Sequence, residues 1–424
     1  MGAQSEKETI MHRHSALVRT LTLALLAAGC ASQSAHRKSS PDATVIEMDP
    51  VKIEAVRRDG TMEITSYDAA ELFEMGATAN SAGRFAEAET HYTRVTTEFP
   101  DSSLFSSALF NLGRVRFDQA KFELAAKDFE LFAARFPGED ARDANFLLGV
   151  CYGKLERWAD SELVFEALLK RDDLSPDDRV EALSRRALSR LRQGDYSDAE
   201  QKFRLVFVYK DKLEASAEAR LDTDYYLAFS QYHMGEISHA QSNAISLRWP
   251  EAQLGKDLEE KSKLLLTARR RYIEAVRYGN PNIASMAAFR IGTLFQEFYD
   301  AVLSVPPPAE LDGADRVEQQ QVYFEELKKK LRVVLEKSLR GHEHNIELFE
   351  RLGVESEWVK KSRDAIDKLR VLLDPGHVGL GDGATPPAPN SESPSDGQPG
   401  PSLNDDQGRG KPATPAPVHD RQIL

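Results

Sequence analysis

Three shortages limit what this 424-residue chain can be. Its two cysteines, Cys30 and Cys151, cannot form a disulfide framework. It lacks a basic excess, because 55 Lys and Arg stand against 68 Asp and Glu, giving a formal net charge of -13; this argues against a nucleic-acid-binding surface. Its N-terminal apolar run, Leu21–Ala28, is far shorter than the roughly 20 residues that cross a bilayer. With 41% hydrophobic residues, the chain still has ample material for a core.

Recognisable catalytic motifs are also missing. The sequence has no Gly-x-Ser-x-Gly elbow and no phosphate-binding loop between a strand and a helix. His342-Glu343-His344 lacks the four-residue spacing that would place two histidines on one helical face for zinc. The adjacent Arg340 and Gly341 predict a loop at a helix end. We therefore expect no enzyme, no metal site and no cofactor.

Residues 1–30 are predicted to be a signal peptide. Arg13 and Arg19 precede the apolar run, and small residues follow it, which is the pattern of a secretory signal. Residues 1–10 are acidic and polar and do not suit such a signal, so a start at Met11 gives a better signal than a start at Met1, and the sequence leaves both open.

The sequence Leu-Ala-Ala-Gly-Cys that ends at Cys30 resembles a bacterial lipobox. The resemblance implies that Cys30 receives fatty-acyl chains and becomes the mature N-terminus. Ala27 departs from it, because leucine is commoner at that position. The alternative is an ordinary signal in which the cysteine is incidental. Ala31, rather than Asp, after the cysteine implies transfer to the outer membrane.

The segment 31–67 is predicted to be a tether that contains a short hairpin. The alternating runs Val51–Val56 and Met62–Thr65 flank Asp59-Gly60, a turn signal typical of hairpins. An extended segment lying on the first repeat would fit the same pattern.

From residue 68 a pattern of small and aromatic residues returns every 36 to 41 residues. A period of this size indicates stacked supersecondary units. Small residues let two helices approach, an aromatic fills the gap to the next unit, glycine suits a turn, and proline ends a helix. The marked residues are Gly76, Gly83, Ala88, Tyr92 and Pro100; Gly113, Ala125, Phe129 and Pro137; Gly149 and Phe165; Ala187, Gly194, Ala199 and Phe203; and Ala228, Gly235 and Ala240.

These residues resemble the tetratricopeptide repeat (TPR), with Ala69 at position one. The resemblance implies an all-α, TPR-type helix-hairpin solenoid of about five to seven units over residues 68–301. In the fifth unit Ala228 takes the helix position and Gly235 the turn position. A degenerate sixth unit is expected through Ala268 and Tyr272 to Pro281, and a further first helix over Ala288–Tyr299.

The first helices of a TPR array commonly bind extended or helical partner segments. Aromatic side chains with a few cations are suitable anchors for such a segment. The same aromatics can instead pack between neighbouring helices, and the sequence leaves both roles open. The positions carried over from the family are Phe73, Asn80, Phe110, Arg114, Phe117, Phe146, Lys154, Arg192, Tyr225, Phe229 and Tyr232.

A second helical block is predicted over residues 302–373. Apolar residues from Phe324 to Leu335 recur at three- and four-residue steps, which indicates an amphipathic helix. A shorter helix is expected at Ile346–Leu352, ending at Gly353, and another at Trp358–Leu372. The remaining residues, 374–424, hold ten of the twenty prolines and few large apolar side chains, so we predict a disordered tail.

Together these features predict a lipid-anchored TPR scaffold for protein–protein interactions. It would lie on the periplasmic face of the outer membrane of a Gram-negative cell, with envelope proteins or peptides as partners. The stretches 287–308 and 173–182 resemble TPR lipoproteins of deltaproteobacterial gliding-motility complexes and imply that process. The alternatives are a barrel-assembly or Tol–Pal-associated TPR lipoprotein and, more distantly, an envelope enzyme or a solute-binding lipoprotein.

Overall fold

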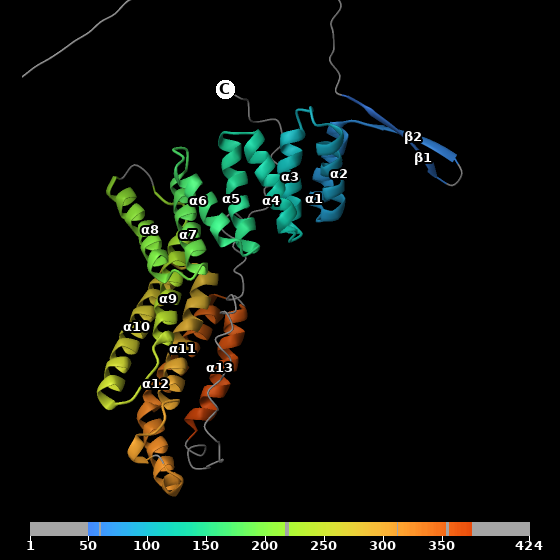
Figure 1. The fold of residues 1–424 in the computed structure, drawn as a ribbon. Coiled ribbons are helices and arrows are strands. Elements are labelled where there is room, and N and C mark those ends of the chain that lie inside the picture. The colour runs from blue at the N-terminus through green and yellow to red at the C-terminus, as the bar shows by residue number, and fades with distance from the viewer. Residues whose placement is uncertain (1–49, 59–60, 217–219, 312, 353–355, 375–424) are drawn as a thin grey trace, which may run out of the picture. The chain divides into compact units, whose positions relative to one another are not determined.

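The computed structural model describes residues 50–58, 61–216, 220–311, 313–352 and 356–374. The predicted signal peptide with Cys30, most of the tether and the proline-rich tail lie outside these ranges. Within them the chain forms one two-stranded ribbon, thirteen α-helices and two 3-10 turns, Ala309–Leu311 and Ala314–Arg316 (Figure 1). None of the described helices has both the length and the apolar character needed to cross a bilayer.

The elements follow one another in a simple order. They are β1 (Lys52–Arg58), β2 (Thr61–Tyr67), α1 (Ala69–Ser81), α2 (Phe85–Glu98), α3 (Phe105–Asp118), α4 (Phe122–Arg135), α5 (Glu139–Lys154), α6 (Trp158–Leu169), α7 (Pro176–Arg192), α8 (Tyr196–Ser216), α9 (Tyr225–Ala244), α10 (Glu251–Arg277), α11 (Pro281–Leu303), α12 (Val317–Leu352) and α13 (Glu357–Leu373).

Several helices begin where the sequence supplies a cap. Asp68 accepts from the backbone N–H of Glu71, whose side chain in turn accepts from the N–H of Asp68, and this capping box starts α1. Ser175 caps α7, which opens on a proline, and Asn280 caps α11 in the same way. A proline at the first helical position has no N–H to leave unpaired, so these residues start helices rather than break them.

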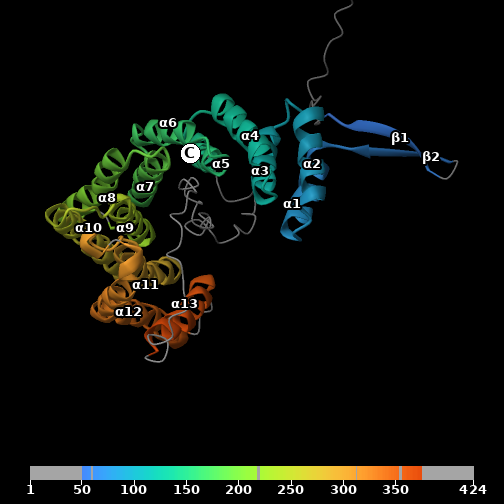
Figure 2. The same cartoon turned by 60° about the horizontal axis from the view of Figure 1, so that its bottom comes forward.

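The helices pack as sequential pairs. α1 lies against α2, and the pairs α3–α4, α5–α6, α7–α8, α9–α10 and α11–α12 follow, while α13 covers α12 and α11 (Figure 2). Each pair also contacts the next through adjoining helices, so a core runs from one unit into its neighbour. This arrangement confirms the predicted all-α helix-hairpin solenoid.

One contact recurs inside these pairs. A glycine of the first helix faces a ring of the second, with less room than a methyl group needs. A Cβ built on Gly113 would lie 2.8 Å from a ring carbon of Phe129. In α7–α8, Ala187 takes the glycine position, and it is buried in one core with Phe203. The other pairs are Gly76–Tyr92, Gly149–Phe165, Gly235–Tyr272 and Gly292–His342.

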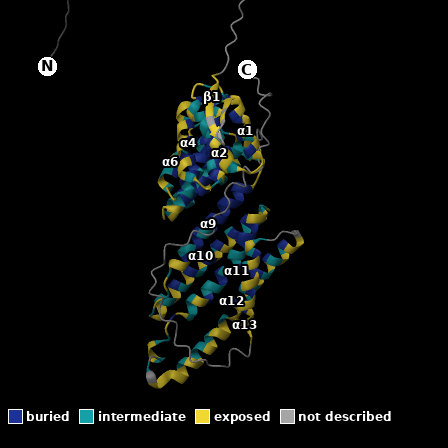
Figure 3. Ribbon diagram, turned by 90° about the vertical axis from the view of Figure 1, so that its right-hand side faces the viewer, coloured by how far each residue is buried: buried dark blue, intermediate teal, exposed yellow. Residues whose placement is uncertain are grey.

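The predicted register of the fifth unit is wrong. Gly235 lies inside α9 rather than in a turn, and Ala240 lies in the same helix. The partner helix is α10, whose Tyr272 packs on Gly235, so the predicted sixth unit around Ala268 is the second half of the fifth. The glycine is there to admit a ring and not to form a turn. Most of α9 is buried (Figure 3), so tertiary packing stabilises the helix and it continues through Gly235 and Ala240.

The predicted break near Gly341 is also wrong. α12 is one helix through Gly341, His342 and the segment from Ile346, and not two helices with a loop between them. A Cβ on Gly341 would lie 3.0 Å from the Cα of Gly292, so this glycine allows α12 to approach α11 closely. Since α11 pairs with α12, the packing also continues across the predicted boundary at 301/302.

Candidate partner-binding surface on the first helices

The candidate surface consists of the solvent-facing residues of the first helices, α1, α3, α5, α7 and α9. Among these, α7 contacts α9, which contacts the first helix of the next unit, α11. The second helices cover the other side of each unit and fix the first helices through the glycine–ring contacts described above.

Six of the eleven predicted groove residues are buried in the core. The ring of Phe73 lies 5.5 Å from that of Tyr92, and the ring of Phe146 lies 6.1 Å from that of Phe165. Such residues hold helices together, which is the packing role left open by the sequence. The six are Phe73, Phe117, Phe146, Tyr225, Phe229 and Tyr232.

The other five keep contact with solvent: Asn80, Phe110, Arg114 and Lys154 are half-buried, and Arg192 is exposed. Phe110 and Arg114 lie four residues apart on α3 and therefore on one helical face. The ring of Phe110 lies 5.4 Å from that of Phe132 and 5.8 Å from that of Phe129, so Phe110 packs on the core of α4 and is only partly accessible to solvent.

Two of these cations have no carboxylate partner among the described residues. Neither Arg114 nor Arg192 forms an ion pair there; the guanidinium of Arg192 lies 5.9 Å from the indole of Trp158, and burial together with this nearby charge lowers the pKa of His233. A cation without an internal counter-charge can bind an anion from outside without first breaking an ion pair.

Most other arginines nearby are already paired. Arg116, on the same helix as Arg114, contacts both oxygens of Asp128 at 2.8 Å and Glu89 at 3.1 Å. Burial raises the pKa of Asp128 to about 6 in spite of this partner. Lys121 also contacts Glu89, at 2.6 Å. Since Glu89 lies on α2, this cluster joins α2 to the α3–α4 pair and leaves little charge for a ligand.

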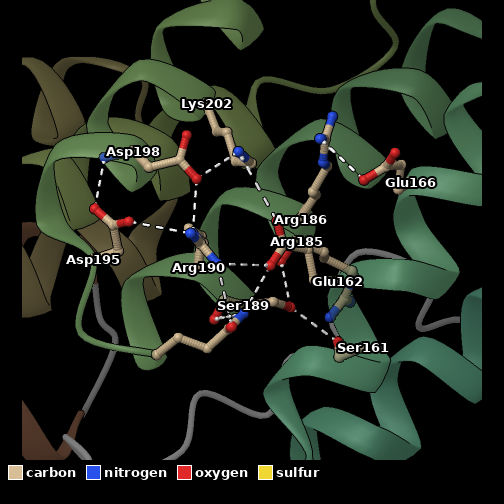
Figure 4. A network of polar contacts seen from close by, with 11 residues as sticks. Ser161, Glu162, Glu166, Arg185, Arg186, Ser189, Arg190, Asp195, Asp198 and Lys202 are labelled. Atoms are coloured by element: carbon tan, nitrogen blue, oxygen red, sulfur yellow. Dashed lines mark hydrogen bonds and ion pairs between the residues drawn. The ribbon is translucent and has the colours of Figure 1, made fainter.

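A larger network fixes α6, α7 and α8 (Figure 4). Arg190 of α7 pairs with Asp198 at 2.7 Å and with Glu162 at 3.7 Å. Lys202 of α8 also contacts Asp198, at 2.6 Å. Nearby, the hydroxyl of Ser189 donates to that of Ser161 at 3.0 Å across the α6–α7 contact. The network is internally balanced in charge and is a structural connection between units.

A second cluster of polar side chains, between α9, α10 and α11, was not predicted from the sequence. Arg290 pairs with Glu236 at 2.6 Å, and Tyr272 also donates to Glu236. Glu297 contacts His239 at 2.8 Å, and this contact holds the pKa of Glu297 below its usual range, although burial alone would raise it. Up to 58 residues separate these partners, so no local motif could have revealed them.

Nothing in the described part of the chain gathers three or more metal-ligating side chains. The sulfur of Cys151 is buried, and burial together with the nearby Asp128 raises its pKa to about 12, so it stays a neutral thiol. A depression on α10, lined by Glu259, Lys263 and Leu266 among others, is shallow and belongs to one helix.

Comparison with known proteins identifies the repeats. The family model for the tetratricopeptide repeat matches residues 73–140, 110–176 and 152–207. The chain contains tetratricopeptide repeats. The matched residues run from α1 into α8 and include Phe110, Arg114 and Arg192. TPR units are protein–protein interaction modules, so the chain is a scaffold of that kind.

Solved structures of TPR proteins are also similar to this chain. A TPR protein from Parabacteroides merdae is 15% identical, covers 70% of this chain and 98% of its own, and has a TM-score of 0.34. A thermophilic TPR protein of Thermus thermophilus is 17% identical, covers 50% of this chain and 96% of its own length, and has a TM-score of 0.28. The Rap conjugation gene regulator of plasmid pLS20, solved with the Phr* peptide, is 12% identical, covers 74% of this chain and 77% of its own length, and has a TM-score of 0.30. No curated protein matches the sequence.

Proposed function

We propose that this protein is a lipid-anchored TPR scaffold of the Gram-negative cell envelope that binds an acidic, extended partner segment along its first helices. The observation that carries partner binding is the pair of cations Arg114 and Arg192. Both lie on first helices of the matched repeats, and neither has a carboxylate partner among the described residues.

The partner's chemistry follows from these side chains. Arg114 would bind a carboxylate of the partner, and Phe110, one turn earlier on α3, would contact an apolar side chain next to it. Asn80 on α1 can donate to or accept from a partner's backbone. Arg192 on α7 would bind a second acidic group, so the segment needs carboxylates at separate positions.

The anchor is proposed from the lipobox-like sequence that ends at Cys30. Several acyl chains on one cysteine would hold the chain firmly, because each buried methylene contributes about 0.8 kcal/mol. The residue after the cysteine favours the periplasmic face of the outer membrane. Gliding motility is the specific process that the resemblance favours, and barrel assembly and Tol–Pal function are the alternatives.

The partner-binding proposal is tested by reversing charge on the first helices. Arg114→Glu combined with Arg192→Glu should remove the partner recovered by crosslinking in cells and mass spectrometry. Arg269→Glu, at an exposed position on α10, is the matched control and should leave the crosslinks unchanged. If the double variant kept its circular dichroism spectrum and all its crosslinks, the first helices would not be the binding surface.

The anchor is tested separately. Cys30→Ala should abolish labelling with radioactive palmitate and release the protein from the membrane fraction. A variant that lost the label and still stayed membrane-bound would contradict anchoring through the acyl chains. The process is then distinguished by deletion of the gene: loss of movement with intact porins supports gliding motility, whereas broad depletion of porins supports barrel assembly.

A further inference from the structure

The β1–β2 ribbon exposes an apolar face. Ile53 is 71% exposed, Ile64 is 73% exposed and Met62 is 61% exposed. Alternate residues of a strand point to opposite faces, and the antiparallel register places these three on the same one. Ile53 and Ile64 are diagonal neighbours across the ribbon, within contact range. The cross-strand pairs on this face are Ile53↔Ser66, Ala55↔Ile64 and Arg57↔Met62.

The opposite face is attached to the first repeat. The hydroxyl of Tyr67 lies 2.5 Å from a carboxylate oxygen of Glu54 and 3.0 Å from one of Glu98 on α2, and it can donate its proton to either. Arg94 of α2 pairs with Glu54 at 3.2 Å and with Glu98 at 2.9 Å, and its guanidinium lies 3.9 Å from the ring centre of Tyr67. The ribbon is therefore fixed by its polar face, and its apolar face points away from α2.

The apolar face of the ribbon is uncovered in the described part of the chain. Each strand pairs only with the other there, and the side chains of Ile53, Met62 and Ile64 stay exposed to water at a cost in free energy. Burial of Ile53, Met62 and Ile64 against another apolar medium would remove this cost.

We propose that the apolar face of β1–β2 docks on the lipid surface to which the chain is anchored. This inference rests on the proposed acylation of Cys30. Residues 31–49 lie between Cys30 and the first described residue, and a segment of this length spans at most about 65 Å. An acylated chain would therefore keep the ribbon within reach of the bilayer.

The side chains suit an interfacial position. Ile53, Met62 and Ile64 would enter the boundary between headgroups and acyl chains, and Arg57 on the same face would reach lipid phosphates. Since the polar face is fixed to α2, two attachments, the acylated cysteine and the ribbon, would set the orientation of the first repeat on the membrane.

The test uses the acylated full-length protein in vesicles of phosphatidylethanolamine and phosphatidylglycerol that contain brominated lipid. A fluorophore is attached at Ile64→Cys, which is possible because Cys30 is acylated and Cys151 is buried. Bromine should quench this probe strongly. A probe at Leu163→Cys, at a similarly exposed apolar position on α6, should not be quenched. Ile53→Ser with Met62→Ser should abolish quenching at position 64.

Other outcomes overturn the inference in distinguishable ways. If the probe at 64 stayed unquenched while the protein remained on the vesicles, anchoring would stand and lipid docking would fail. If that probe became shielded only after envelope proteins were added, a partner protein would cover the ribbon instead. Failure of acylation would appear as a missing acyl mass. The chain, now with Cys30→Ala so that only the cysteine at position 64 is labelled, would then be held on the vesicles through an N-terminal histidine tag and a nickel-chelating lipid, where an unquenched probe would again reject lipid docking.

Discussion

At the scale of single residues, the glycines of the first helices have a packing role. Gly76, Gly113, Gly149 and Gly235 each face a ring at a distance where a Cβ would lie 2.6 to 2.8 Å from a ring carbon. Real Cβ atoms do not approach so closely, so any larger residue must displace the ring. Each ring is buried and cannot move without disturbing the neighbouring helix.

We therefore expect Gly113→Ala to lower the free energy of unfolding by about 1–3 kcal/mol, the usual cost of overpacking. Gly255→Ala is the control, because Gly255 lies in α10 and a Cβ added there would meet nothing within 4 Å. The control should raise stability by about 0.5–1 kcal/mol through helix propensity. Denaturant unfolding measures both, and equal effects at the two positions would contradict the packing role.

The turns between paired helices carry strain at two positions. Gly83 and Gly194 have positive φ in the first and fourth units, but Ala120 and Glu156 take φ of 57° in the second and third. A side chain in the left-handed region is crowded by the backbone, whereas glycine is not.

Ala120→Gly and Glu156→Gly should each raise the free energy of unfolding by up to about 1 kcal/mol. The free energy gained by relieving this crowding is larger than the cost of the extra conformational freedom that glycine gives the unfolded chain. Gly83→Ala should have the opposite effect, since Gly83 has a φ of 72°. Thermal and denaturant unfolding would reveal both signs. A loss of stability at position 120 or 156 would show that the alanine or glutamate side chain makes a contact worth more than the strain.

At the scale of elements, the α11–α12–α13 group depends on a buried histidine. The ring of His342 occupies the position that phenylalanine or tyrosine holds in the earlier units, against Gly292. Its Nδ1 lies 3.3 Å from the hydroxyl of Ser362 on α13, and its buried Nε2 has no partner among the described residues. Burial lowers the pKa of His342 to about 4.

This lowered pKa predicts acid sensitivity. The unfolded chain takes up a proton near pH 6.5 but the folded chain only near pH 4, so stability is lost as the pH falls through this interval. The loss is at most about 3 kcal/mol. His342→Phe should remove this part of the pH dependence, whereas His344→Phe, at an exposed position on the same helix, should retain it. Unfolding curves at pH 4 and pH 7 for both variants provide the measurement.

At the scale of the whole molecule, the units depend on their neighbours rather than on one central core. The larger contacts in the described chain join helices that are adjacent or nearly adjacent in sequence. In such an array stability is a sum of unit and interface contributions, so a defect remains local.

Hydrogen exchange should show this locality. Gly292→Ala would collide with His342 and should speed amide exchange in α11, α12 and α13 while leaving α1–α4 unchanged. Gly76→Ala, which collides with Tyr92, should give the reverse pattern. Uniform acceleration by either variant would mean that the array unfolds as one cooperative unit, contrary to the expectation.

The sequence by itself determined the all-α class and the first four units. There the small residue, the ring and the helix ends are close in the chain, as in Gly76, Tyr92 and Pro100, and local spacing is enough to place them. Tertiary structure decided the rest. It showed Gly235 and Gly341 to be points of close approach inside long helices, because a glycine that breaks a helix and one that admits a neighbour look alike in sequence. It also decided which groove candidates are buried, since burial of Phe73 or Phe146 depends on helices that pack from elsewhere in the chain. The candidates that keep contact with solvent, among them Phe110, Arg114 and Arg192, are those available to a partner.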